Sequence, residues 1–366
     1  MPLRNAEITG WGRYIPSLVV TNRDLVDFVD TSDEWIESRT GIKQRHYSHV
    51  STGEMGWLAA ERALAAAGLS AADLDLVILG STTPDEVCPN TASYIKNKLG
   101  ASDAAAFDLN SACTSWFYGL TVATDMIKAG TIKRALVIGA ERLSLAMDWN
   151  KRESCCLFGD GAGAVVVQSS SSDTGLLSSK LSCVPDSRDY LKIPCWGIRP
   201  ELHTGGLHPS LDFDGTAIFK RAIVAMAKDC HQALEAAGVS LEDIDLFVPH
   251  QANARIIEGL ARKLNFPAEK TVICIDKYAN TSAASMPIAL CEALDSGRLK
   301  PGMTILMATF GAGLTSGAGV MRWGDRVVIE GVSDASIPAY DQSVRELLSD
   351  SFSYHGVVCK SQPVGQ

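Results

Sequence analysis

The sequence lacks any run of about 18 apolar residues, the length that a membrane-spanning helix requires. Its start, Met1 to Pro16, includes Arg4 and Glu7 but no apolar stretch of the kind found in a signal peptide. We therefore expect a cytoplasmic protein that has no membrane partner. With 46% hydrophobic and 20% charged residues, the chain can bury a large core.

Closely paired cysteines, as in a zinc site or a secreted disulfide framework, are also missing. The ten cysteines are scattered over 366 residues, so we expect most to be reduced and buried, and no metal or cofactor is expected. Positive charge is not in excess, since 33 Lys and Arg stand against 42 Asp and Glu, for a net charge of −9. Nucleic acid is therefore not an expected partner, because phosphate binding needs clustered basic residues.

What the sequence does contain is a long internal repeat. Residues 63–80, ALAAAGLSAADLDLVILG, align without a gap to residues 233–250, ALEAAGVSLEDIDLFVPH, at an offset of 170. Each segment predicts a helix that ends at a glycine, a short loop and a buried strand of a parallel sheet. The repeat is longer than a solenoid unit of about 20 to 50 residues, so we interpret it as a duplicated α/β domain.

A second pair of segments follows in the same order. Residues 106–115, AFDLNSACTS, and the helix and strand after them match residues 274–285, CIDKYANTSAAS, and their helix and strand, at an offset of 167 or 168. This alignment puts Asn280 one position away from Cys113. Because strand-to-helix turns lie at the carboxyl ends of parallel strands, we predict that Cys113, His250 and Asn280 meet at one site.

These three residues suit thioester chemistry. Cys113 is predicted at the N-terminus of a helix, where the helix dipole favours a thiolate and free N–H groups favour a developing oxyanion. His250 and Asn280 together supply the two hydrogen-bond donors that an enolate beside a thioester requires. Taken singly, each residue has a plain alternative: a small buried side chain, a core histidine and a helix N-cap, respectively.

Two glycine-rich segments do not have the pattern of nucleotide-binding loops. FGDGAGAVVV, from Phe158, leads into a strand and not into a helix, and FGAGLTSGAG, from Phe310, has neither the spacing nor the lysine of a phosphate loop. We interpret both segments as places of close backbone approach.

Taken together, these segments resemble β-ketoacyl-acyl carrier protein synthase III, a family of condensing enzymes in the thiolase superfamily. The resemblance covers about residues 8–323 and implies a thiolase-like fold, in which two pseudo-symmetric α/β halves form α-β-α-β-α layers. The implied halves are residues 1–174, with the nucleophile, and residues 175–323, with the His and Asn. Residues 324–366 form an extension of unknown role, whose SVRELLSDSF segment predicts a short helix packed on the body or on a partner subunit. The motifs that carry the resemblance are DTSDEWIESRTGIKQRH from Asp30, SACTS, FGDGAGA, PHQANARII, ANTSAAS and FGAG.

The resemblance implies an acyltransferase of fatty acid biosynthesis that works in two stages and forms a homodimer. Cys113 would take an acyl group from acyl-coenzyme A, and malonyl-acyl carrier protein would then lose carbon dioxide and condense with that group to give 3-oxoacyl-acyl carrier protein. His250 and Asn280 would promote the decarboxylation. The oxyanion hole would consist of the backbone N–H groups of Cys113 and Ala312.

The resemblance also implies binding residues. Trp35, Arg39, Arg152 and Asn253 would contact coenzyme A, and Lys220 and Arg255 would dock an acidic acyl carrier protein. The acyl pocket would be bordered by Cys88, Leu143 and Phe158. Members of the family that prefer acetyl tend to have Phe where this chain has Cys88, so the smaller side chain predicts tolerance of primers longer than acetyl.

Several alternatives remain open at this point. A specialised starter-unit synthase, a polyketide-type synthase or an acyltransferase would use the same Cys-His-Asn site, and a cysteine hydrolase would let water reach the acyl-enzyme. A degradative thiolase is disfavoured, since residues 310–319 lack a second cysteine. A non-catalytic partner subunit would be expected to lose the nucleophile or its His and Asn, which are all present.

Overall fold

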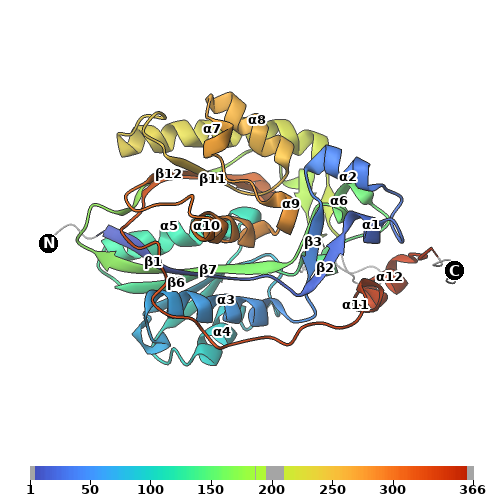
Figure 1. Cartoon of the computed structure of the whole chain (residues 1–366), viewed down its shortest axis with the longest axis horizontal. Helices are drawn as coiled ribbons and strands as arrows, with labels where there is room; N and C mark the ends of the chain where they lie inside the picture. Colours follow the sequence, from blue (N-terminus) through green and yellow to red (C-terminus); the bar gives the residue numbers. More distant parts are fainter. Residues whose placement is uncertain (1–4, 186, 195–209, 361–366) are drawn as a thin grey trace.

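Two β-sheets lie on either side of a pair of central helices (Figure 1). The computed structural model describes residues 5–185, 187–194 and 210–360. The first sheet has five strands in the order β1-β7-β6-β4-β5, and the second has four in the order β11-β12-β13-β8. The strands of the first sheet are β1 (Asn5–Tyr14), β4 (Leu76–Gly80), β5 (Ala105–Leu109), β6 (Arg134–Glu141) and β7 (Gly161–Ser170); those of the second are β8 (Gly175–Cys183), β11 (Leu246–Pro249), β12 (Thr304–Gly311) and β13 (Thr315–Arg322).

Helices separate and cover the sheets in α-β-α-β-α layers, as Figure 1 shows. Helices α5 (Ser115–Lys128) and α10 (Ser285–Asp295) lie between the sheets, and apolar residues from both sheets pack around them. Helices α3 (Thr52–Ala67) and α4 (Thr91–Leu99) cover the outer face of the first sheet. Helices α7 (Gly215–Ala237) and α8 (Ala254–Leu264) cover that of the second. The predicted thiolase-like layering is confirmed.

The two halves repeat the same topology, and three of the four matched strand pairs, β1 with β8, β4 with β11 and β6 with β12, share an offset of 170 residues. Strand β4 pairs with β6 in parallel with Leu76 opposite Ala135, and β11 pairs with β12 in parallel with Leu246 opposite Ile305. In both halves the next two strands of the sheet pair antiparallel. The second sheet therefore has the strand arrangement of the first sheet but no strand that corresponds to β5. The strands of the first sheet end by residue 170 and those of the second start at residue 175, while the domain boundaries at 174 and 323 stay a prediction.

The offset of 167 or 168 that the sequence predicts for the second pair of segments is wrong at the turn. The turns Ala112–Thr114 and Ser282–Ala284 correspond at an offset of 170, and so do the starts of α5 and α10. Helix α10 has 11 residues where α5 has 14, and the loop that follows is longer by the same number. The glycines after these helices, Gly130 and Gly297, lie at an offset of 167 for this reason. The structural counterpart of Cys113 is thus Ala283, and that of Asn280 is Asn110.

Short elements surround the layers at one end of the molecule, where α1, α2 and α6 lie in Figure 1. Two small antiparallel sheets pair β2 with β3 and β9 with β10. These elements are α1 (Asn22–Leu25), α2 (Asp33–Thr40), α6 (Arg152–Cys155), α9 (Ile275–Tyr278), β2 (Leu18–Thr21), β3 (Gln44–Tyr47), β9 (Leu191–Lys192) and β10 (Asp212–Phe213).

The described part of the C-terminal extension, residues 324–360, runs along the first half. It starts beside the end of α3, where the N–H of Glu330 donates to the carbonyl of Ala66 at 3.1 Å, and it ends in α11 (Val344–Leu347) and α12 (Ser349–His355). Phe352 of α12 packs against Phe28 and Trp149. The prediction that this segment packs on the body is confirmed, with two short helices in place of one.

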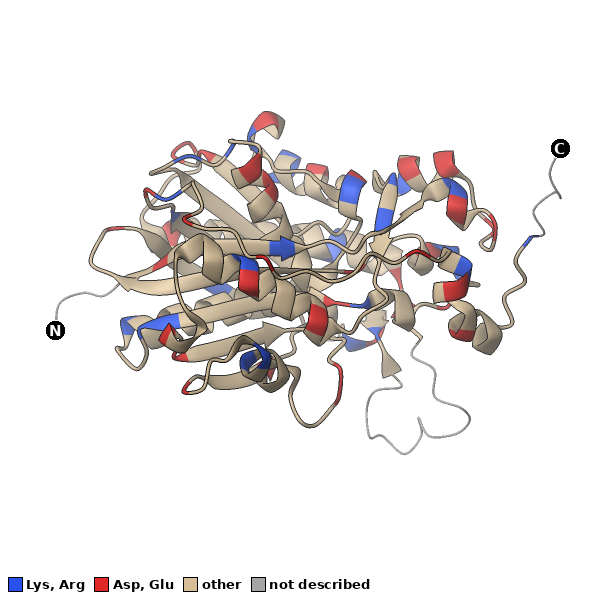
Figure 2. Cartoon of the chain, turned by 60° about the horizontal axis from the view of Figure 1, so that its bottom comes forward, with Lys and Arg blue, Asp and Glu red and all other residues tan. Residues whose placement is uncertain are grey.

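The surface carries mixed charge. On the face shown in Figure 2, basic and acidic residues are interspersed along the helices and loops. Six of the nine described cysteines are buried, as the sequence predicts; Cys88 and Cys183 are exposed and Cys359 is half-buried. Cys195 lies outside the described residues.

Candidate active site

Cys113 lies, as the sequence predicts, in the turn between strand β5 and the N-terminal end of helix α5. Strand β5 ends at Leu109, a 3₁₀ turn spans Ala112–Thr114, and α5 begins two residues after Cys113. Ala112 has a φ of 58°, a left-handed conformation that non-glycine residues seldom adopt. The side-chain oxygen of Asn110 accepts from the N–H of Ala112 at 3.1 Å and so supports this turn.

His250 follows directly after β11 and is buried, with only 4% of its surface exposed. Its N–H donates to the carbonyl of Ala308 at 2.8 Å, and its Nδ1 is hydrogen-bonded to the hydroxyl of Ser285. Burial lowers the pKa of His250 to about 3, so the ring is neutral near pH 7. Because Nδ1 is occupied, Nε2 is the nitrogen that remains for a substrate.

Asn280 is held on both sides of its backbone by the segment that contains Phe158. Its N–H donates to the carbonyl of Leu157 and its carbonyl accepts from the N–H of Gly159, each at 3.0 Å. Its side-chain oxygen accepts from the N–H of Ser282 at 2.8 Å. The side-chain NH₂ group is therefore the part of Asn280 that is left to donate to a ligand.

The three residues line one cavity of about 570 Å³. Cys113 comes from the first half, and His250 and Asn280 come from the second, as the duplicated topology predicts. Ten of the thirteen residues that the sequence singles out line this cavity. They are Trp35, Arg39, Cys113, Arg152, Phe158, Lys220, His250, Asn253, Arg255 and Asn280.

The sulfur of Cys113 has a polar neighbour that the sequence analysis did not identify. The hydroxyl of Ser282 lies 3.2 Å from the Cys113 sulfur and 3.0 Å from a carboxylate oxygen of Glu141. Burial is the main cause that raises the pKa of the Cys113 thiol to about 12, whereas the hydrogen bond from Ser282 lowers it. The resting side chain is therefore a thiol.

Close backbone packing beside Cys113 explains the glycine-rich turn after β12. A Cβ atom on Gly311 would lie 2.8 Å from the backbone nitrogen of Cys113, so only glycine lets these two backbone segments approach this closely. This packing brings the turn at Ala312 next to Cys113. An oxyanion hole made by the N–H groups of Cys113 and Ala312 stays a prediction.

Trp35 and Arg152 face each other at the wall of the cavity. The guanidinium carbon of Arg152 lies 4.8 Å from the centre of the Trp35 ring, and the Arg152 side chain also donates to the carbonyl of Asp30 at 3.1 Å. Asn253 is the N-cap of α8 and donates to the carbonyl of Arg39 at 3.2 Å. These four predicted coenzyme A contacts thus occupy one region of the structure.

Lys220 and Arg255 come from α7 and α8, which form another part of the same wall. The guanidinium of Arg255 lies 5.9 Å from the centre of the Phe219 ring. Two basic side chains on neighbouring helices are therefore placed beside the route to Cys113.

A second cavity, of about 940 Å³, meets the first at Cys113. Cys113, Phe158 and Leu191 line both, and Leu143 and Ala312 line the second only. Cys88 lines neither cavity within a single chain and is exposed, although Val87 and Glu86 do line the second. The nucleophile therefore stands between two chambers.

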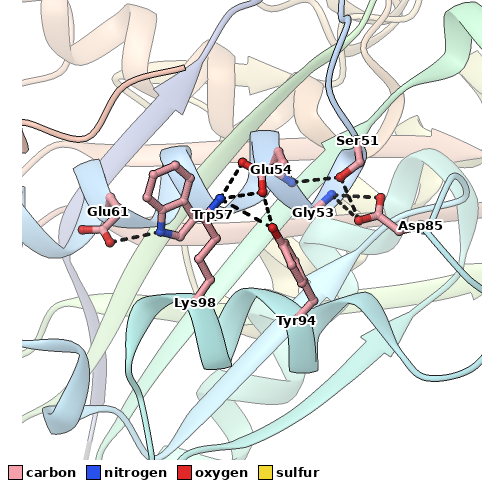
Figure 3. Close-up of polar contacts among 8 residues, drawn as sticks. All are labelled: Ser51, Gly53, Glu54, Trp57, Glu61, Asp85, Tyr94 and Lys98. Atoms are coloured by element: carbon pink, nitrogen blue, oxygen red, sulfur yellow. Dashed lines mark hydrogen bonds and ion pairs between the residues drawn. The ribbon is translucent and has the colours of Figure 1, made fainter. Parts of the chain in front are cut away.

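The loop that contains Cys88 is tied to the start of α3 (Figure 3). The carboxylate of Asp85 accepts from the N–H of Gly53 at 3.0 Å and from the hydroxyl of Ser51 at 2.9 Å. Glu54 of α3 pairs with Lys98 of α4, whose ammonium nitrogen lies 3.9 Å from the centre of the Trp57 ring. Asp85 thus positions one wall of the second cavity.

Three polar residues at the site were missed in the sequence: Glu141, Ser282 and Ser285. A charged residue at the end of the apolar strand ALVIGAE was the one available signal for Glu141. Among the described residues, no group of three His, Cys, Asp or Glu side chains could hold a metal ion. No helix in the described part of the chain is long and apolar enough to cross a membrane.

Comparison with protein families gives two matches. The model described as 3-oxoacyl-[acyl-carrier-protein] synthase III matches residues 107–185, and its C-terminal counterpart matches residues 234–323. The β-ketoacyl-[acyl-carrier-protein] synthase III 2 of Vibrio cholerae is 47% identical over 350 residues, covering 95% of this chain and 97% of the relative. The synthase III of Symbiobacterium thermophilum is 44% identical over 330 residues, which is 88% of this chain and all of that one.

Solved structures show the same relationship. The crystal structure of 3-oxoacyl-[acyl-carrier-protein] synthase III from Aquifex aeolicus is 44% identical, with a TM-score of 0.82 over 87% of this chain and 100% of the other. The priming β-ketosynthase of the R1128 polyketide pathway is 32% identical, with a TM-score of 0.83 over 89% and 98%. The resemblance predicted from the motifs is confirmed, and the chain belongs to the β-ketoacyl-acyl carrier protein synthase III family.

Proposed function

We infer that the chain is a condensing acyltransferase that loads an acyl group from acyl-coenzyme A onto Cys113. It then joins that group to the two-carbon unit of malonyl-acyl carrier protein, with loss of carbon dioxide. The observation that carries this function is the convergence of Cys113, His250 and Asn280 on one cavity. The names of the relatives point to the same reaction.

In the first stage, the sulfur of Cys113 attacks the thioester carbon, and the thiol of coenzyme A leaves. Trp35 and Arg152 at the cavity wall are suited to the adenine and phosphates of the donor, because an aromatic ring can stack on a base and a guanidinium pairs with phosphate. N–H groups at the start of α5 and in the turn at Ala312 would stabilise the oxyanion.

In the second stage, the malonyl thioester enters the same cavity. Loss of carbon dioxide leaves negative charge on the thioester oxygen, and Nε2 of His250 and the NH₂ group of Asn280 are the donors available to it. The neutral state of His250 suits this role, because a neutral imidazole whose Nε2 carries the hydrogen donates without a prior proton transfer. The enolate then attacks the acyl group on Cys113.

The partners follow from this reaction. Lys220 and Arg255 at the cavity would attract an acidic carrier protein, and a homodimer is proposed from the family resemblance. The volume of the second cavity, about 940 Å³, supports primers longer than acetyl, since ligand pockets span roughly 300 to 1,000 Å³.

The test is to incubate the protein with acetyl-, butyryl- or octanoyl-coenzyme A labelled in the acyl group, digest it and locate the label. We expect label on Cys113, and its transfer to a 3-oxoacyl product on addition of malonyl-acyl carrier protein. Cys156 also lines the cavity, so the matched control is Cys156→Ser, which should keep the label. Label on another residue, or release of free acid in place of the product, would overturn the proposal. A strict preference for acetyl would exclude the longer primers.

A further inference from the structure

Glu141, Ser282 and Cys113 form a continuous polar chain that ends at the reacting sulfur. The Ser282 hydroxyl is hydrogen-bonded to both neighbours, at 3.0 Å from Glu141 and 3.2 Å from the Cys113 sulfur. Glu141 is fully buried and Ser282 is 2% exposed. Glu141 ends strand β6 in the first half, whereas Ser282 belongs to the second, so the contact joins the two halves at the nucleophile.

Six hydrogen-bond donors surround the carboxyl group of Glu141. Its oxygens accept hydrogen bonds from the hydroxyls of Ser81, Thr82, Thr83 and Ser282, and from the N–H groups of Thr82 and Thr83. Because these groups donate to the carboxyl oxygens, they favour the charged form of Glu141. Burial nevertheless raises the pKa of Glu141, although the hydrogen bonds from Thr82, Thr83 and Ser282 lower it. Such a buried charge is well placed to take a proton.

The hydroxyl of Ser282 determines the direction in which protons can move between Cys113 and Glu141. A hydroxyl has one hydrogen and two lone pairs, so Ser282 donates to only one of its neighbours at a time. When its hydrogen points to Glu141, a lone pair faces the S–H of Cys113. One shift of two protons then leaves a thiolate and a neutral carboxylic acid.

The backbone at Ser282 is held in an unusual conformation that aims this hydroxyl. Its φ is 50°, in the left-handed region, and its counterpart in the first half is Ala112, with a φ of 58°. Strained residues of this kind cluster at functional sites. At this position of the duplicated turn, the copy that carries the nucleophile has an alanine, and the copy that faces the nucleophile has a serine hydroxyl.

Loading of Cys113 needs a proton acceptor. The thiol is the resting form, since burial raises its pKa to about 12. Nδ1 of His250 is hydrogen-bonded to Ser285. Its Nε2 carries the hydrogen that is donated in the second stage, so neither ring nitrogen accepts the proton of Cys113. Glu141 is the carboxylate that reaches the sulfur through one hydroxyl.

We propose that Ser282 and Glu141 form a proton relay that removes the proton of Cys113 during acyl transfer, stores it on Glu141, and returns it when the product leaves. The relay rests on the proposed function. As the S–C bond to the acyl group forms, the Cys113 proton moves to Ser282, and the Ser282 hydrogen moves to Glu141. Coenzyme A departs as a thiolate and takes a proton from water.

The second stage closes the proton balance. The enolate attacks the acyl group, the C–S bond breaks, and the Cys113 thiolate takes back a proton from Ser282, which is refilled from Glu141. One proton is therefore consumed from solvent per turnover, at the release of coenzyme A. The acyl-enzyme carries a protonated Glu141 throughout its lifetime.

The experiment follows proton uptake and label together in a single acylation. The protein is mixed with one equivalent of labelled acyl-coenzyme A in weakly buffered solution at neutral pH, a dye reports the proton change, and label on Cys113 gives the extent of reaction. We expect uptake of close to one proton per labelled Cys113, because the thiol of coenzyme A, with a pKa of about 8.5 or higher, is protonated at that pH. An infrared band of a protonated carboxylic acid should appear with the label.

Variants separate the relay from general damage to the site. Glu141→Gln should abolish both the uptake and the infrared band, and Glu141→Gln and Ser282→Ala should each slow labelling by roughly 100-fold or more, the range for loss of a general base. Asp229→Asn is the matched control, because Asp229 is another buried carboxylate that accepts from hydroxyls, of Ser182 and Ser316, but it lines neither cavity. It should keep the uptake.

Label on Cys113 without proton uptake in the unmodified protein would overturn the relay and leave the proposed function intact. Labelling of both variants at the original rate would do the same. Absence of label from Cys113 would instead defeat the proposed function, and the relay with it.

Discussion

In the first half of the molecule, β5 leads into a turn that holds Asn110, Ala112 and Cys113; the corresponding turn in the second half holds Asn280, Ser282 and Ala283. Both turns place a residue in the left-handed region, and in both the asparagine side chain accepts from the N–H of that residue. The backbone has been kept while the side chains have diverged.

The same divergence holds at the strand ends. His250 corresponds to Gly80, and Gly311 corresponds to Glu141, because β11 and β12 pair in the same register as β4 and β6. Each half therefore carries a polar side chain, His250 or Glu141, where the other carries a glycine against which the backbone packs closely. Substitutions at matched positions of two similar α/β halves have therefore produced one site.

The strongest test of this asymmetry is to move the sulfur. Cys113→Ala should lower the condensation rate by at least about 1,000-fold, as expected for loss of a nucleophile. Adding Ala283→Cys to that variant should restore nothing, because Ala283 lines neither cavity and its carbonyl packs against Gly139. Rates of 3-oxoacyl product formation measure both. Recovery in the double variant would mean that the two turns are interchangeable.

Substitution of the two corresponding asparagines, Asn110 and Asn280, compares the two turns directly. Asn280→Ala should lower condensation by about 100- to 1,000-fold, because it removes a donor to the enolate as well as the turn contact. Asn110→Ala removes the matching turn contact and lies in the second cavity, so its loss should be well below tenfold. Equal losses in the two variants would show that Asn280 acts only through the turn.

The C-terminal extension also breaks the symmetry, because its described part packs against α3 and against Phe28 and Trp149 of the first half. Phe352→Ala should lower the free energy of unfolding by about 2 to 3 kcal/mol, since the ring packs between Phe28 and Trp149 but belongs to a terminal segment. Val358→Ala, at a position that is 86% exposed, should change it by less than about 0.5 kcal/mol. Chemical denaturation measures both values. A null result for Phe352 would mean that the extension is not part of the folded core.

The smallest expected effect compares two helix ends. Gly68 after α3 and Gly238 after α7 have φ values of 67° and 65°, so alanine at either should cost about 1 kcal/mol of stability. A Cβ on Gly68 would also lie 2.0 Å from a carboxylate oxygen of Glu330 in the extension, whereas nothing lies within 4 Å at Gly238. Gly68→Ala should thus be the more destabilising by thermal denaturation, and deletion of residues 324–366 should remove the difference.

The sequence predicted the duplicated fold because buried strands and glycine-ended helices leave local patterns. It misplaced Asn280 relative to Cys113 because α10 is shorter than α5, and a length change inside a helix leaves no local mark. The convergence of Cys113, His250 and Asn280 followed from topology alone.

Contacts across the two halves were beyond a reading of the sequence. Glu141 and Ser282 are 141 residues apart, and neither stands in a motif that announces its partner. Cys88 shows the opposite difficulty, because a family resemblance assigned it to a pocket that it does not line within one chain. Long-range packing, rather than local pattern, decides both cases.

The proposed function assigns acyl loading to Cys113 of the first half and decarboxylation to His250 and Asn280 of the second, at a common cavity. The most direct measurement is to follow both stages in His250→Ala, as label on Cys113 from acyl-coenzyme A and as carbon dioxide release from malonyl-acyl carrier protein. We expect acyl labelling within a few-fold of the unmodified protein and carbon dioxide release lowered by about 100-fold or more. Equal loss of the two stages, or unchanged carbon dioxide release, would contradict it.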